Sequence, residues 1–93
     1  MSAEPTHPPF EIAVSLNPHV EPIAVATATS YEAANAAVRT IAARYGKRYG
    51  AHVVHEKITK RGYLELRLVF DQPAAGAGSI RVVARAATSR FGR

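Results

Sequence analysis

Arginine and lysine are the residues of this sequence whose types and positions point most clearly to a chemistry, the binding of an anion. All 12 lie in residues 39–93, which hold three acidic residues, whereas residues 1–38 hold four glutamates and no basic residue. The net charges of the two parts are therefore −4 and +9. Such an asymmetry is typical of a protein with an anionic partner.

The other polar residues form no pattern for catalysis or metal binding. His52 and His55 are three residues apart in a predicted strand, where they would point to opposite faces and would not chelate one ion. His7 and His19 lie in predicted loops without partner ligands. No nucleophile, base and orienting acid stand in a recognisable motif. We therefore expect a protein that is not an enzyme and holds no metal or other cofactor.

The clearest predicted element is a helix over residues 29–46. Thr29 and Glu32 fit a capping box, and Gly46 suits the left-handed position after a helix end. Between them, apolar residues recur at helical spacing and predict one buried stripe: Ala34, Ala37, Val38, Ile41, Ala42 and Tyr45.

Alternation of apolar and polar residues predicts strands over residues 10–16, 23–28, 52–58 and 63–70. The last two form a hairpin if Lys60-Arg61-Gly62 is a three-residue turn with a bulge. This register pairs Lys57 with Glu65 and Val54 with Leu68. It also places Glu56 on the apolar face opposite Leu66, a conflict that only a position at the sheet edge would relieve.

Residues 79–87 fit either a strand or a helix begun by Ser79. The β-branched residues Ile80, Val82 and Val83 favour the strand, with Arg81 and Arg85 facing outward. The expected fold is then α+β, with the order ββαβββ: an antiparallel sheet of four or five strands with one helix packed on one face.

The length of 93 residues predicts a single domain over residues 10–87, with a flexible N-terminal arm at 1–9 and a basic tail at 88–93. The sequence contains no cysteine, so disulfides and thiolate chemistry are excluded. Its apolar runs are too short to span a membrane, and its N-terminus lacks the pattern of a signal peptide. These features predict a cytoplasmic protein without a membrane partner.

The solvent face of the predicted sheet is the candidate binding surface. A face that carries guanidinium groups and a tyrosine binds phosphates by charge and stacks a base on the ring. Because no base-reading motif is present, we expect sequence-tolerant binding of DNA or RNA. The expected contacts are Arg67, Arg81 and Arg85 at the centre, Lys57, Lys60 and Arg61 at the flanks, and Tyr63 as the stacking platform, with Arg90 and Arg93 extending the surface.

Two other interpretations stay open. Charged residues on a sheet face also serve only to keep the face solvated, and Glu65 partly neutralises this one. Alternatively, the protein is a protein–protein module that binds a partner or a second copy through an apolar spot formed by Val53, Val69 and Val83. An inhibitor or adaptor encoded by a phage or mobile element would have these features. Charge reversal of Arg81 and Arg85 separates nucleic-acid binding from association through the valines.

Overall fold

The computed structural model describes residues 9–16, 21–72 and 78–87. In chain order its elements are β1 (Phe10–Leu16), β2 (Ile23–Ala28), α1 (Tyr31–Tyr49), β3 (Ala51–Ile58), β4 (Leu64–Phe70) and β5 (Ser79–Ala86). This confirms the α+β class and the order ββαβββ. The predictions for the first eight residues, for the loop that contains His19 and for the basic tail lie outside the described residues.

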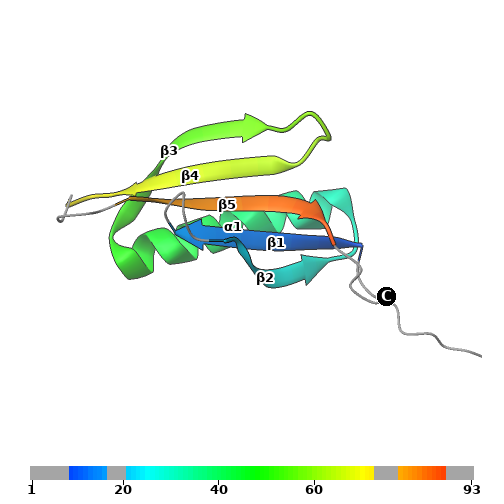
Figure 1. Cartoon of the computed structure of the whole chain (residues 1–93), viewed down its shortest axis with the longest axis horizontal. Coiled ribbons are helices and arrows are strands. Elements are labelled where there is room, and N and C mark those ends of the chain that lie inside the picture. Colours follow the sequence, from blue (N-terminus) through cyan, green and yellow to red (C-terminus); the bar gives the residue numbers. More distant parts are fainter. Residues whose placement is uncertain (1–8, 17–20, 73–77, 88–93) are drawn as a thin grey trace, which may run out of the picture.

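The five strands form one antiparallel sheet with the order β2-β1-β5-β4-β3. β5 lies between β1 and β4, and α1 crosses one face of the sheet (Figure 1). The alternate residues Ile80, Val82 and Ala84 are buried, so residues 79–86 form the strand that their β-branched side chains favoured. Together with the buried stripe of α1 they build the core between helix and sheet.

Both ends of α1 differ from the prediction. The N-cap is Ser30, whose hydroxyl accepts a hydrogen bond from the Ala33 amide at 3.0 Å, rather than Thr29. The helix also continues past Gly46 and ends at Gly50, which adopts the left-handed conformation with φ of 67°. Gly46 has a different role: a Cβ atom there would lie 2.7 Å from the carbonyl oxygen of Ala51, so the glycine permits close packing of α1 on β3.

The β3–β4 turn has the predicted geometry. Gly62 has φ of 88°, the Gly62 amide donates to the Thr59 carbonyl at 2.9 Å, and the Thr59 amide donates to the Tyr63 carbonyl at 2.8 Å. The N-terminal end of α1 holds this turn in place. Asn35 Oδ1 accepts a hydrogen bond from the Leu64 amide at 2.9 Å, and Asn35 Nδ2 donates to the Gly62 carbonyl at 3.3 Å.

The hairpin register is confirmed near the turn and wrong further away. Lys57 pairs with Glu65 as predicted, but Leu68 pairs with Val53 instead of Val54 because β3 has an irregularity between Val53 and His55. An extra residue in one strand of an antiparallel pair shifts every residue beyond it to the other face. No local sequence signal marked this position.

This shift changes the faces of His52 and Val53. His52 pairs with Val69 and His55 with Arg67, so both histidines are on the same side of the sheet, contrary to the prediction. Val53 pairs with the buried Leu68, on the side that faces α1. The predicted apolar spot is therefore not assembled, because Val53 lies on the face opposite to the other two valines.

The shift does not create a metal site among the described residues. His52 Nδ1 lies 2.5 Å from Asp71 Oδ1, in an exposed pair at the edge of the sheet. Within residues 9–16, 21–72 and 78–87, no three histidine or acidic side chains are grouped as metal ligands would be. In the same part of the chain, no helix has the length and hydropathy that a membrane span requires.

Glu56 does face the helix side of the sheet, as the register implied. β3 is an edge strand, and Arg39 of α1 reaches Glu56 there, with Nη2 donating to Oε2 at 2.8 Å. The conflict in the sequence is thus resolved by an ion pair between helix and edge strand. The Arg39 guanidinium lowers the pKa of the Glu56 carboxyl, chiefly through this hydrogen bond and then through its charge.

We expect Glu56→Gln to lower the free energy of unfolding at neutral pH but not in acid. A carboxyl whose pKa is lowered by folding contributes stability above its unfolded-state pKa, and this contribution is lost as the pH falls through the folded-state pKa. Urea unfolding of both proteins at about pH 7 and about pH 3 measures the difference, which should close in acid. An equal loss at both pH values would mean that packing, rather than charge, is what Glu56 contributes.

Candidate anion-binding site

The sheet face that points away from α1, here called the open face, carries a row of polar side chains across four strands. Ser15 of β1 pairs with Arg81 of β5, Arg81 pairs with Arg67 of β4, and Arg67 pairs with His55 of β3. Residues directly opposite one another in an antiparallel sheet share a face and lie close together. This row, here called the arginine row, contains no carboxylate.

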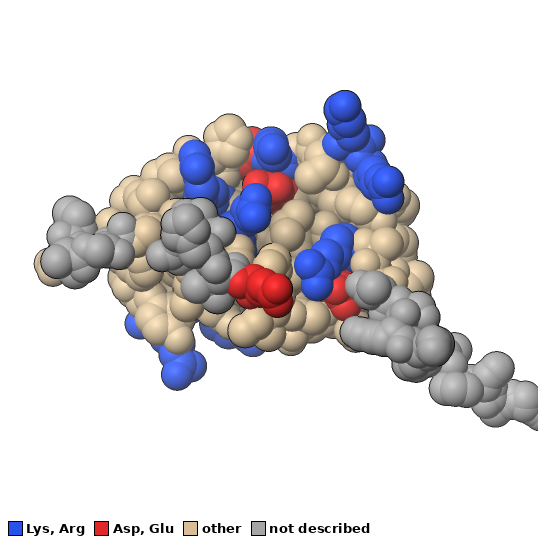
Figure 2. Space-filling model, in the orientation of Figure 1, with Lys and Arg blue, Asp and Glu red and all other residues tan. Residues whose placement is uncertain are grey.

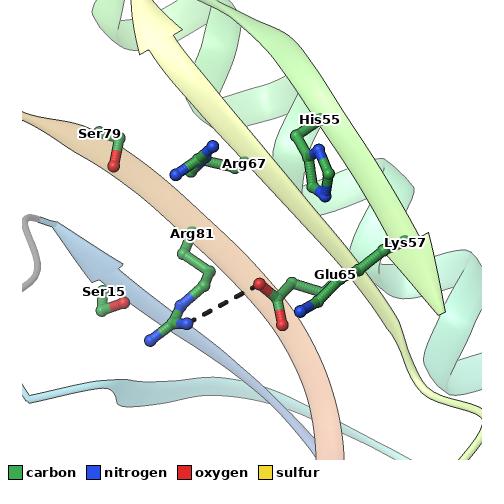
Figure 3. Close-up of a pocket in the computed structure, with 7 residues that line it drawn as sticks. All are labelled: Ser15, His55, Lys57, Glu65, Arg67, Ser79 and Arg81. Atoms are coloured by element: carbon green, nitrogen blue, oxygen red, sulfur yellow. Dashed lines mark ion pairs between the residues drawn. The ribbon is translucent and has the colours of Figure 1, made fainter. Parts of the chain in front are cut away.

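The next row on the open face contains the nearest acid. There Val83 of β5 pairs with Glu65 of β4, and Glu65 pairs with Lys57 of β3. Side chains of both rows, together with Ser79 at the start of β5, surround a hollow of about 440 Å³ (Figure 3). It is lined by Ser15, His55, Lys57, Glu65, Arg67, Ser79 and Arg81. Three cations and one carboxylate leave the hollow with a net charge of +2 when His55 is neutral.

The two arginines of the row reach in different directions. The Arg67 guanidinium extends toward Ser79, whereas the Arg81 guanidinium extends toward Ser15 (Figure 3). Arg81 Nη1 lies 3.8 Å from Glu65 Oε2, which is a loose contact for an ion pair. Among the described residues, no ion pair joins Arg67 to a carboxylate. The hollow thus presents one loosely paired guanidinium and one without an acidic partner.

Two hydroxyl groups complete the lining. Ser15 is only 7% exposed, and Ser79 is half-buried at the start of β5. Serine hydroxyls and guanidinium groups are both donors to oxyanions, and guanidinium is the side chain best suited to bidentate contact with phosphate. The sequence offered a signal for both serines, because the predicted alternation places each of them on the outward face of its strand. Neither serine was predicted to be a site residue.

The structure brings together three of the seven predicted contacts, Lys57, Arg67 and Arg81, around the hollow. Arg85 lies four residues beyond Arg81 on β5 and does not line the hollow. Its Nε donates to Glu11 Oε2 at 2.6 Å, across the β1–β5 pair. Arg85 therefore has an acidic partner of its own. Figure 2 shows the open face, with the few acidic groups standing next to basic ones.

Lys60 and Arg61 are exposed in the β3–β4 turn, next to the hollow's strands but outside its lining. The backbone carbonyl of Arg61 accepts a hydrogen bond from the Tyr31 hydroxyl at 3.0 Å, which ties the turn to α1. Their role as flanking phosphate contacts stays a prediction.

Tyr63 is not available as a stacking platform. It is only 9% exposed, and its ring lies against those of Tyr31 and Phe10, with centroids 5.3 Å and 6.1 Å away. Tyr63 precedes the first residue of β4, so the alternation of the strand does not determine where its ring points. Burial raises the pKa of its hydroxyl. The prediction for Tyr63 was wrong because aromatic packing decided its orientation.

Comparisons of the chain with models of protein families, with curated proteins and with solved structures found no match. The chemistry of the hollow is therefore inferred from its own geometry and charge.

Proposed function

We propose that this protein is a non-enzymatic binding domain that holds nucleic acid by its phosphates, through the open face of the sheet. The observation that supports this proposal is the arginine row, in which Arg67 and Arg81 are paired across neighbouring strands and both line a hollow with net positive charge. Contacts to phosphate position a nucleic acid and carry no sequence information directly. Lys57 also lines the hollow, and Lys60 and Arg61 extend the basic surface along the hairpin turn.

The described residues offer no aromatic platform on the open face, which supports binding without a preference for single strands. Among the described residues, no Phe or Tyr ring lines the hollow, and Tyr63 is buried between helix and sheet. Stacking of bases on aromatic rings is a major source of affinity for single strands over duplexes. We therefore propose that the protein does not prefer single strands and binds duplex DNA, single-stranded DNA and RNA by the same phosphate contacts.

The salt dependence of binding tests this proposal. We expect micromolar binding of fluorescein-labelled duplex DNA at low salt, measured by anisotropy. If Lys57, Arg67 and Arg81 each contact a phosphate, log affinity should fall against log salt with a slope of about −2 to −3. Two duplexes of unrelated sequence should give the same curve. Absence of binding to DNA and RNA at low salt would refute the proposal.

A second candidate function is association with a protein partner or a second copy, in the manner of an adaptor or inhibitor. The observation that favours it is the apolar surface of the edge strand β3, where Val53, Val54 and Ile58 are 44%, 49% and 60% exposed. The irregular pairing at Val54 disfavours simple strand addition at this edge, because bulges twist an edge away from a partner strand. Sedimentation equilibrium tests self-association, which Ile58→Lys should abolish.

A further inference from the structure

The arginine row has an electrostatic cost that the described side chains do not remove. Arg67 and Arg81 are directly opposite one another on neighbouring strands, and like charges in that position destabilise a sheet. Glu65 offsets this cost only in part, because its carboxylate is 3.8 Å from Arg81 Nη1 and the residue opposite Glu65 on β3 is a third cation, Lys57. An anion bound in the hollow that both arginines line would neutralise their charges.

The hollow matches one anionic group better than a length of backbone. A volume of about 440 Å³ is in the range of small-molecule sites and holds more than a bare inorganic ion. The net charge of +2 complements a phosphate monoester, which carries a charge of about −1.5 to −2 at neutral pH, better than it complements a single diester. Ser15 and Ser79 add hydroxyl donors beside the two guanidinium groups.

Glu65 sets the orientation of such a ligand. Its half-buried carboxylate, 3.8 Å from Arg81 Nη1, repels a second phosphate and accepts hydrogen bonds from hydroxyl groups. The phosphate end of a ligand would therefore lie in the arginine row, and an attached sugar would lie toward Glu65 and Lys57.

We propose that the hollow is a phosphate-monoester site, in which Arg67 and Arg81 hold the phosphate and Ser15 and Ser79 donate to its oxygens. This inference rests on the proposed function for the source of the monoester, which is the phosphorylated end of a nucleic-acid strand. A free mononucleotide presents the same chemistry, and the experiment distinguishes the two.

The test compares one oligonucleotide with a 5′-phosphate and the same oligonucleotide with a 5′-hydroxyl, at equal ionic strength. Amide chemical shifts of the full chain report the affinity and the place of binding. We expect the phosphorylated strand to bind about tenfold more tightly, since one charge-assisted contact is worth about that factor. Arg67→Gln or Arg81→Gln should remove this advantage, and Arg44→Gln, an equal loss of charge on α1, should leave it intact. Adenosine monophosphate should shift the amides of the arginine row.

Each outcome separates the two proposals. Equal binding of both strands would overturn the phosphate-monoester site and leave nucleic-acid binding standing. Binding of adenosine monophosphate without binding of either strand would support the site and refute the proposed function. An advantage that survives both glutamine variants would place the phosphate elsewhere and overturn the inference. Because Arg67→Gln relieves a like-charge pair, this variant should unfold at no lower urea concentration than the wild type, which controls for misfolding.

Discussion

The double substitution Arg67→Glu and Arg81→Glu is expected to weaken the binding of duplex DNA about 100-fold at low salt, with each lost phosphate contact contributing about tenfold. Both arginines line the hollow, and the reversal replaces their attraction for phosphate with repulsion. Anisotropy titrations of labelled duplex measure the change. The variant also makes the salt slope shallower by about two, because two fewer counterions are released.

The matched control is Arg44→Glu with Lys47→Glu, two exposed residues of α1. Each double reversal lowers the formal net charge by four, from +5 to +1, so a difference between the two variants reports the position of the charges and not their number. Similar losses in both would mean that overall charge, and not the open face, drives binding. The double substitution uses Arg67 rather than Arg85, because reversal of Arg85 would also break its ion pair with Glu11. A loss of binding in an Arg85 variant would then not be separable from a loss of stability.

The substitution Gly46→Ala is expected to destabilise the protein by about 1–3 kcal/mol, the usual cost of overpacking. At an ordinary position inside a helix this change would stabilise by about 1 kcal/mol, because alanine is the better helix former. Here the new Cβ would lie 2.7 Å from the Ala51 carbonyl oxygen and 3.3 Å from Leu68 Cδ2. Since Ala51 begins β3, relief of this contact would require α1 and β3 to move apart.

Urea denaturation measures the change, and Ala43→Gly calibrates it. Ala43 is exposed in the same helix, so its replacement should cost about 1 kcal/mol through helix propensity alone. If Gly46→Ala stabilised the protein by a similar amount, the close approach of α1 to β3 would be refuted. The test matters for function because β3 supplies His55 and Lys57 to the hollow.

Much of the fold was predictable because it depends on repeating patterns. The alternation in Phe10–Leu16 and Leu64–Phe70 must bury one face of each strand, and the stripe from Ala34 to Ala42 must bury one face of the helix. Such patterns average over several residues, so one ambiguous position does not change the result. The ends of α1 depend on single side chains. Thr29 and Gly46 fit the capping rules as well as Ser30 and Gly50, the residues that cap the helix in the structure.

The candidate site was likewise predictable only where it depends on local properties of the chain. By itself the sequence determined that basic residues dominate after residue 38 and that Arg67 and Arg81 lie on the outward face of their strands, since charge and side-chain alternation are local properties. Only the tertiary structure decided that these two arginines are direct neighbours, because the sheet order places β5 beside β4 and the register aligns them. It also decided that Tyr63 is buried, that Arg85 is paired with Glu11 and that His52 shares a face with His55. These outcomes depend on contacts between distant segments and on one irregularity in β3, and neither leaves a periodic signal in the chain.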